Sequence, residues 1–262
     1  MYKLCQEGIL KMRFNERKAL IISTLKKQPI LSFPELELLL GVSPTTIRRD
    51  LTTLEKEGIL SRFHGGIKKN NGIIEQSMSK KQSLNIEAKK KIGKIAASLI
   101  HPNELIFIGS GSTTYYMINY IKDTSITVIT NGIPHAEALN AKNIRAFLLC
   151  GFLKDKTRSV VGKETNKLIE SYHFDQVFSS ANGMNADFDI LSTDEYEHNI
   201  KKSAVSRGKV SYIMIDSSKF NKTAMYTLPR NENTYIITES LTEELKKIKN
   251  VITPSEKDNK RK

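Results

Sequence analysis

Three short amphipathic helices are the clearest hydrophobic pattern in the first 60 residues of the chain. They are predicted over residues 15–27, 34–40 and about 44–57, each with apolar residues on one face. In the third helix the apolar residues recur at positions i, i+4 and i+7, so they form one stripe that a small core can bury. This stripe consists of Ile47, Leu51 and Leu54. The pattern predicts a small helical domain in this part of the chain.

The third helix also has a start signal and a polar face that suit contact with DNA. Ser43 can cap the helix, and Pro44 suits its first position, where an amide donor is not needed. Hydroxyl and guanidinium groups lie opposite the apolar stripe, as on helices that contact phosphates and base edges in a major groove. The side chains expected to contact DNA are Ser43, Thr45, Thr46, Arg48, Arg49 and Thr52. This arrangement is typical of a helix-turn-helix, and a helical hairpin with a solvated basic face is the alternative.

A predicted pair of short strands follows the third helix and forms a wing. Residues 59–63 have the pattern of a strand, Gly65 and Gly66 permit a sharp return, and a second strand starts at Ile67. Such a wing usually lies along the DNA backbone, where basic side chains donate to phosphates. The expected donors are Arg62, His64, Lys68 and Lys69, although His64 is equally well explained as a turn residue.

Beyond residue 87 the pattern changes to apolar strands that alternate with helices. A polar stretch over 71–86 is predicted to be a linker, and a helix over 87–99 opens the second domain, with the basic run Lys89–Lys91 on its solvated face. The strands are expected at 105–108, 126–129, 146–149, 176–178 and 210–215. Such alternation specifies a mostly parallel sheet covered on both faces. The predicted organisation is a winged helix-turn-helix over 12–70, the linker, an α/β domain over 87–250 and a charged tail over 251–262.

A loop rich in glycine and hydroxyl side chains follows the first strand of this sheet. Small residues expose backbone amides, and the helix that starts in the loop adds a favourable dipole for an anion. Two further loops, at 131–132 and 216–219, follow other strands, so all three can converge on one edge of the sheet. The expected contacts with a phosphate monoester are Ser110, Gly111, Ser112, Thr113, Thr114, Asn131, Gly132 and Lys219. The loop is otherwise explained as an ordinary turn between strand and helix, and Lys219 as a surface lysine.

The charge of the chain favours a polyanionic partner. It has 262 residues, with 41 Lys and Arg against 28 Asp and Glu, for a net charge of +13. Residues 1–70 hold 13 basic and 7 acidic residues, so the positive charge is densest at the end that carries the predicted DNA-binding helix. Charge alone does not separate DNA from RNA or a membrane surface.

The rest of the composition excludes several classes of protein. Two cysteines are too few for a disulfide framework, and no apolar run approaches the roughly 20 residues of a membrane span. The first ten residues lack the hydrophobic core of a signal peptide, so a cytoplasmic protein is expected, starting at Met1 or Met12. The five histidines show no ligand spacing, and neither a metal nor a cofactor is expected.

Several of these motifs resemble one family of regulators. Residues 17–66, with Val-Ser-Pro-Thr-Thr-Ile-Arg-Arg-Asp-Leu and Arg-Phe-His-Gly-Gly, resemble the DeoR-type winged helix. Residues from about 87 to 238 look like the family's sugar-sensing domain, which is similar in fold to ribose-5-phosphate isomerase; Asp216 to Phe220 matches its Asp-x-Ser-Lys-Phe motif. The resemblance implies a transcriptional repressor that binds a double-stranded DNA operator and is released by a phosphorylated sugar.

Departures from the family pattern point to a subgroup. The chain has Gly109 where the family usually has Asp, Cys150-Gly151 in place of Gly-Gly, and Asn182 where Gly is common. Gly109 and the Phe-Ser-Ser near residue 178 look more like the lactose phosphotransferase-system repressors. That subgroup responds to tagatose 6-phosphate, so the resemblance implies a ketohexose phosphate as the effector.

A sugar-phosphate isomerase is the main competing hypothesis. Isomerases of this fold have two carboxylates in an Asp-Gly-Ala-Asp segment, whereas this chain has Ser-Ser-Ala-Asn at 179–182. Proton transfer needs a base within hydrogen-bonding reach, so no enzyme is expected unless acidic residues from 187–195 substitute. An RNA-binding protein and a regulator that activates transcription are two further hypotheses. One winged helix is small for a specific DNA site, so a homodimer or homotetramer is expected.

Overall fold

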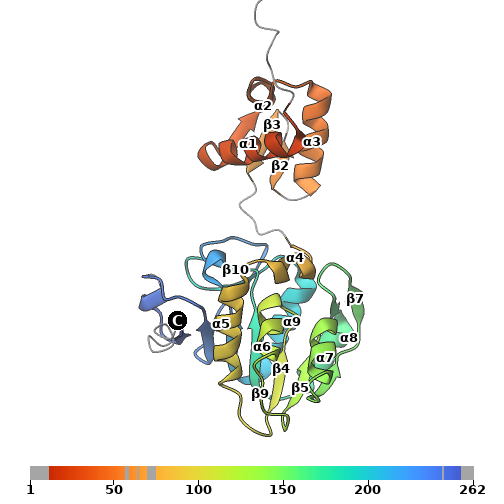
Figure 1. Cartoon of the computed structure of the whole chain (residues 1–262), viewed down its shortest axis with the longest axis vertical. Coiled ribbons are helices and arrows are strands. Elements are labelled where there is room, and N and C mark those ends of the chain that lie inside the picture. The colour runs from red at the N-terminus through yellow and green to blue at the C-terminus, as the bar shows by residue number, and fades with distance from the viewer. Residues whose placement is uncertain (1–11, 57–58, 64, 70–74, 244, 255–262) are drawn as a thin grey trace, which may run out of the picture. The chain divides into compact units, whose positions relative to one another are not determined.

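Two compact units make up the chain. The computed structural model describes residues 12–56, 59–63, 65–69, 75–243 and 245–254 (Figure 1). The second unit begins at Glu75. Each unit has a hydrophobic core of its own, so the two are described separately.

The described residues of the first unit form three helices and a three-stranded antiparallel sheet in the order β1-β3-β2. Its elements are α1 (Phe14–Lys27), β1 (Ile30–Ser32), α2 (Phe33–Leu40), α3 (Pro44–Lys56), β2 (Leu60–Phe63) and β3 (Gly66–Lys69). The predicted helices and wing strands are confirmed. Strand β1 was not predicted, because it has only three residues and only its middle side chain is buried.

The turn between α2 and α3 explains the glycine in the helix-turn-helix sequence. Gly41 ends α2 with a φ of +59°, in the left-handed region that favours glycine. At the other end of α2, Ser32 and Glu35 form a capping box, in which the Glu35 carboxylate accepts from Ser32 N at 2.6 Å. Both ends of this short helix are therefore set by local sequence.

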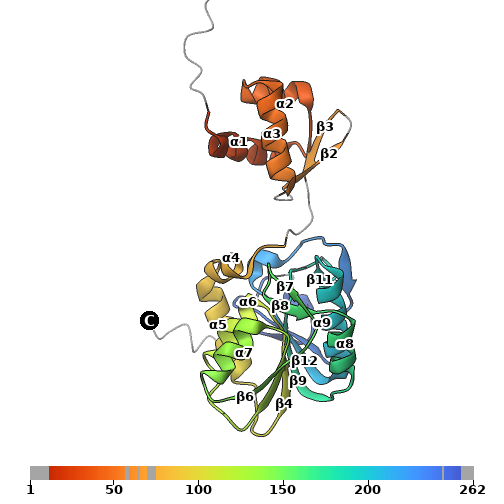
Figure 2. The ribbon, with the colours of Figure 1, turned by 90° about the vertical axis from the view of Figure 1, so that its right-hand side faces the viewer.

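The second unit is built around a parallel sheet of seven strands in the order β15-β14-β12-β9-β4-β5-β6 (Figure 2). The strands of this sheet are β4 (Leu105–Ile108), β5 (Thr127–Thr130), β6 (Arg145–Leu148), β9 (Phe174–Ser180), β12 (Gly208–Met214), β14 (Thr234–Ile237) and β15 (Val251–Ile252). Its helices are α4 (Met78–Ser83), α5 (Ile86–Ala97), α6 (Ser112–Ile118), α7 (Ile133–Asn140), α8 (Lys163–Glu170) and α9 (Glu195–Arg207). The predicted α/β class with a parallel sheet is confirmed.

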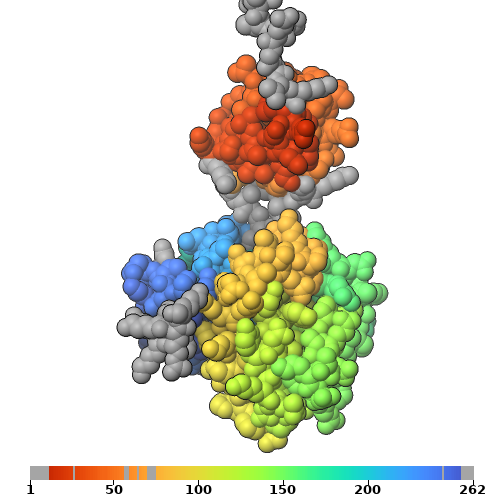
Figure 3. Space-filling view, viewed as in Figure 1, coloured from red at the N-terminus to blue at the C-terminus, as the bar shows by residue number. Residues whose placement is uncertain are grey.

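Helices cover both faces of this sheet. Helices α5, α6 and α7 lie on one face and α8 and α9 on the other (Figure 2), and α5 to α7 form a continuous surface in the space-filling view (Figure 3). Strand β4 alternates accordingly, because Ile106 and Ile108 join the core under α5 and α6, while Phe107 joins the core under α8 and α9. Gly93 lets α5 approach α6, since a Cβ there would lie 2.9 Å from Met117 N.

The structure differs from the prediction at both ends of the second domain. The second half of the predicted linker belongs to this unit, because Met78–Ser83 form α4 and Met78 is buried. A six-residue helix has fewer than two turns, so its pattern was too short to detect in a polar stretch. The predicted tail also starts too early, because Val251 and Ile252 pair with β14.

Two small antiparallel sheets were not predicted either. One is a hairpin of β7 (Phe152–Lys154) and β8 (Ser159–Val161), and the other joins β10 (Gly183–Met184), β11 (Ile190–Ser192) and β13 (Tyr226–Leu228). All five strands have two or three residues, which is too short for an alternation to be visible in the sequence.

Candidate functional site

The recognition helix α3 has the two faces that its sequence predicts. Ile47, Leu51 and Leu54 are fully buried. The cap is also present, since Ser43 Oγ accepts a hydrogen bond from Thr46 N at 3.3 Å. Of the predicted DNA contacts, Ser43, Thr45, Arg48 and Arg49 are exposed, and Thr46 and Thr52 are half-buried.

A buried ion pair, missed in the sequence, ties α3 to α1. Arg17 Nε donates to Asp50 Oδ2 at 2.6 Å, and Arg17 Nη2 donates to Asp50 Oδ1 at 3.2 Å. The guanidinium also donates to the carbonyl oxygen of Met12. The hydrogen bond to Asp50 and the negative charge of Asp50 raise the pKa of Arg17, although burial alone would lower it. Asp50 therefore orients the recognition helix from its buried side.

One of the predicted phosphate donors of the wing is bonded to the third helix. Arg62 Nε donates to Glu55 Oε2 at 2.7 Å and Arg62 Nη1 to Thr52 Oγ1 at 3.3 Å, so this guanidinium has partners on α3. Lys68 is exposed on β3 and Lys69 is half-buried. His64 lies outside the described residues.

In the second unit, the three predicted loops do converge at the carboxyl edge of the sheet. Strands β5 and β4 are neighbours, and β9 separates β4 from β12. Ser110 N donates to Asn131 Oδ1 at 3.0 Å, which joins the first two loops. Lys219 Nζ donates to the carbonyl oxygen of Ala181 at 3.2 Å, which brings the third loop to the end of β9. The convergence predicted from the strand pattern is thus confirmed.

Several of the residues predicted to contact the effector also hold the loop at 109–114 in shape. Thr114 Oγ1 donates within the loop, to Gly109 O at 2.5 Å or Gly111 O at 2.8 Å. Both polar atoms of the Asn131 side chain are bonded: Oδ1 accepts from Ser110 N, and Nδ2 donates to Val160 O at 3.2 Å. Ser112, Thr113 and Thr114 are buried, and Thr113 Oγ1 has no hydrogen-bond partner among the described residues. Ser110 and Gly111 are the half-exposed members of the loop.

His135 is a further support of this loop that the sequence did not indicate. Its Nε2 lies 3.0 Å from Gly111 O and 3.1 Å from Thr114 Oγ1. Burial lowers the pKa of His135 to about 4, so the ring is neutral near pH 7 and donates to the Gly111 carbonyl from Nε2. Gly132 packs against the ring, since a Cβ there would lie 2.4 Å from His135 Nδ1.

A segment from the predicted linker is bonded to the carboxyl-edge loops and to the elements around them. We call residues 75–85 the strap. Met78 N donates to Lys156 O in the β7–β8 hairpin at 2.8 Å. Tyr116 Oη on α6 donates to Gln82 O at 3.0 Å. Asn85 Nδ2 donates to Asp216 Oδ1 in the loop after β12 at 2.9 Å. The strap is therefore part of the candidate site, although its composition is that of a linker.

The prediction that Lys89 lies on a solvated helix face is wrong. Its side chain is buried, and Nζ donates to the carbonyl oxygens of Lys81 and Leu84 in the strap. A signal was present, because Lys89 precedes Ile92 by three residues and Ala96 by seven, which places it on the apolar face of α5. Lys90 is exposed and pairs with Glu87, as a solvated residue does.

Several lysines with lowered pKa values gather around the strap. Burial, and then the charge of Lys219, lowers the pKa of Lys89 from 10.5 to about 8. Burial also lowers the pKa values of Lys219 and Lys201, against the opposing effects of Asp216 and Glu197 respectively. A buried ammonium gains most from a nearby negative charge. This edge of the sheet is therefore electrostatically suited to an anionic ligand.

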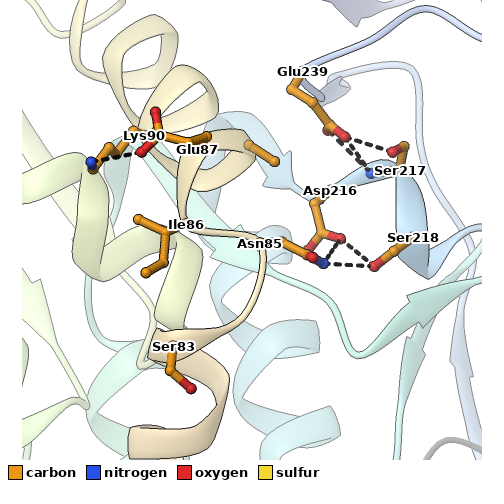
Figure 4. A pocket seen from close by; sticks show the side chains of 10 residues that line it. Ser83, Asn85, Ile86, Glu87, Lys90, Asp216, Ser217, Ser218 and Glu239 are labelled. Atoms are coloured by element: carbon orange, nitrogen blue, oxygen red, sulfur yellow. Dashed lines mark hydrogen bonds and ion pairs between the residues drawn. The ribbon is translucent and has the colours of Figure 1, made fainter.

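A cavity of about 620 Å³ lies beside these groups, at the ends of β12 and β14 (Figure 4). Asn85 and Ser218 both donate to Asp216 Oδ1, while Ser217 N and Oγ donate to Glu239 (Figure 4). Asp216 Oδ2 lies 3.8 Å from the Lys219 ammonium. The cavity wall therefore offers hydroxyl, amide and carboxylate groups, which suit a polyhydroxylated ligand.

Two of the acidic residues considered as replacements for the missing isomerase carboxylates, Asp189 and Asp194, have partners elsewhere. Asp194 Oδ1 caps α9 by accepting from Glu197 N at 3.0 Å, and its other oxygen pairs with Lys154 at 3.3 Å. Asp189 bonds with Asn185 through both its backbone and its side chain. Among the described residues, no group of His, Cys, Asp or Glu is arranged to hold a metal ion.

Comparisons with known proteins identify both units. Residues 17–72 match the DeoR-like helix-turn-helix domain, and residues 84–240 match the DeoR C terminal sensor domain. The chain is 37% identical over 209 residues to the "Uncharacterized HTH-type transcriptional regulator FruR" of Bacillus subtilis, covering 79% of this chain and 83% of that protein. It is 36% identical over 225 residues to the "Lactose phosphotransferase system repressor" of Streptococcus mutans, covering 83% and 89%.

A solved structure that matches part of the chain is a ribose 5-phosphate isomerase A from Methanocaldococcus jannaschii. The match covers 52% of this chain and 55% of that one, at 17% identity and a TM-score of 0.39.

No described helix is long and apolar enough to cross a membrane.

Proposed function

The chain belongs to the DeoR family of transcriptional regulators, and on that premise we propose that it represses a sugar catabolic operon until a phosphorylated sugar binds its second unit. The first unit binds duplex DNA through α3, with Arg48 and Arg49 in the major groove and the wing along the backbone. Contacts with phosphates supply much of the affinity, so binding weakens steeply with salt.

One observation supports the effector site most strongly. The ammonium groups of Lys89 and Lys219 lie near the carboxyl-edge loops, where burial makes a negative partner favourable. A phosphate there also meets the hydroxyl of the half-exposed Ser110, whereas the amides of Ser110 and Gly111 donate to Asn131 Oδ1 and Thr114 Oγ1. Thr114, Asn131 and His135 keep these groups in place, and the polar cavity beside Asp216 takes the sugar hydroxyls.

The identity of the effector is proposed from relatives. The Streptococcus mutans protein is named as a lactose phosphotransferase system repressor, which favours a ketohexose phosphate such as tagatose 6-phosphate. The missing pair of carboxylates at 179–182 argues against turnover of such a sugar, so the site is proposed to bind without catalysis. Two DNA-binding units on repeated half-sites, in a dimer or tetramer, complete the proposal.

A thermal-shift screen tests the effector site directly. Hexose and pentose phosphates are compared with the same sugars lacking phosphate and with inorganic phosphate. A sugar phosphate at 100 times its dissociation constant stabilises the protein by about 2.7 kcal/mol, which is visible as a higher unfolding temperature. The free sugars are expected to cause no shift. Equal shifts by free sugars, or no shift by any sugar phosphate, would contradict the proposed effector class.

A further inference from the structure

Glu75 is the first residue of the second unit, and its carboxylate is held at the candidate effector site. Oε2 accepts hydrogen bonds from Asn182 Nδ2 at 3.1 Å and from Thr193 Oγ1 at 2.6 Å, and Oε1 pairs with the Lys81 ammonium. The Glu75 side chain is only 13% exposed. The point at which the chain enters the second unit is therefore anchored to residues that follow β9 and β11 at the edge of the sheet.

The partners of Glu75 are connected to the lysines proposed to bind phosphate. Lys81 pairs with Glu75 through its ammonium and accepts from Lys89 through its carbonyl oxygen. Lys219 donates to Ala181 O, one residue before Asn182. Burial lowers the pKa of Lys219 and Asp216 raises it. The charge of Lys81 lowers this pKa further, and the charge of Glu75 raises it. Glu75 thus lies within electrostatic reach of the proposed phosphate position.

A bound phosphate and a docked Glu75 carboxylate oppose each other. Both are negative, and the charge of Lys219, proposed to bind the phosphate, also interacts with Glu75, so each anion weakens the attraction that holds the other. A phosphate that engages Lys89 also competes with the bonds from Lys89 to the strap, which fix the segment between Glu75 and α5. Occupation of the site therefore favours release of Glu75.

We propose that Glu75 couples the effector site to DNA binding: docked Glu75 belongs to the DNA-binding state, and an anionic effector displaces its carboxylate from Lys81, Asn182 and Thr193. This inference rests on the proposed function, in which the effector weakens DNA binding. Coupling between two ligands is reciprocal. A change that weakens the docking of Glu75 must therefore weaken DNA binding and strengthen effector binding.

The test uses Glu75→Gln in the full-length chain, with Glu243→Gln as a matched control. Glu243 pairs with Lys246 and is 83% exposed, so the control also removes one carboxylate from an ion pair. DNA affinity is measured by fluorescence anisotropy, on a duplex selected by the unmodified protein from random sequences. Effector affinity is measured by calorimetry with the sugar phosphate that gives the largest thermal shift. Glu75→Gln is expected to bind DNA about tenfold more weakly and the effector more tightly, whereas the control changes neither.

The possible results separate failure of the role of Glu75 from failure of the proposed function. DNA and effector affinities of Glu75→Gln that equal those of the control overturn the role of Glu75. A variant that binds both ligands more weakly, with a lower unfolding temperature, also overturns it, because that result indicates general damage. If the unmodified protein binds no sugar phosphate, the proposed function itself fails.

A second variant covers the case in which Glu75→Gln does not fold. Thr193→Val removes the shorter hydrogen bond from Glu75 Oε2 without changing any charge. It is expected to shift both affinities in the same directions by a smaller factor. Unchanged affinities in a folded Thr193→Val, together with failure of Glu75→Gln to fold, would also overturn the role of Glu75.

Discussion

Replacing Asp50 with alanine is expected to unfold the DNA-binding unit while leaving the second unit intact. The change removes the two hydrogen bonds from the Arg17 guanidinium to Asp50, at 2.6 and 3.2 Å, and leaves that cation without a carboxylate at a site where only 11% of its side chain is exposed. Breaking a buried ion pair in this way costs about 3–5 kcal/mol. That loss is comparable with the whole stability of a small domain, which is about 5 kcal/mol at the lower end of the usual range.

Urea unfolding followed by circular dichroism and by hydrogen exchange measures this loss for each unit. The transition of the first unit should move to lower urea concentration or disappear, and amides in the second unit should keep their protection. A paired change, Arg17→Met with Asp50→Leu, leaves no buried charge and should recover most of the lost stability. A loss below about 1 kcal/mol for Asp50→Ala would refute the reasoning, because such a value is typical of an exposed pair.

Three further predictions concern DNA contact, the buried lysine and catalysis. Arg48→Ala combined with Arg49→Ala should abolish operator binding in a gel shift. The unfolding temperature should not fall, because both side chains are exposed. Retained binding would contradict the placement of α3 in the DNA interface. The pKa of Lys89 is lowered from 10.5 to about 8, so the unfolded chain holds more protons between those values, and the free energy of unfolding should rise with pH in that window. Lys89→Met should lose that rise and bind sugar phosphate at least tenfold more weakly, as calorimetry can show. Isomerase assays with pentose and hexose phosphates should show no turnover, and measurable turnover would support the enzyme hypothesis.

The parts of the fold that repeat a hydrophobic period were predictable from sequence. The stripe of α3 spans two turns, and the five predicted strands of the large sheet have at least four residues each, so both are visible without tertiary information. The convergence of the loops at Ser110, Asn131 and Lys219 followed from the rule that parallel strands end at one edge.

The parts that were missed depend on contacts between distant residues. Arg17 and Asp50 are 33 residues apart on different helices, so no local pattern pairs them. Glu75 lies in a stretch where lysine, serine and glutamine suggest a linker, and two of its partners, Asn182 and Thr193, are more than 100 residues away. The supporting bonds of Thr114 and Asn131 were missed for the same reason, because only the structure shows which groups their side chains contact within the protein.

The measurement that tests the whole account most directly is the DNA affinity of the full-length protein with and without a sugar phosphate. A fluorescent duplex selected by the protein is titrated alone, with tagatose 6-phosphate, with other hexose phosphates and with the corresponding free sugars, at one salt concentration. The account predicts that at least one sugar phosphate weakens DNA binding about 5- to 150-fold and that the free sugars do not. DNA affinity that is the same with every sugar phosphate, at concentrations that stabilise the second unit, would contradict it.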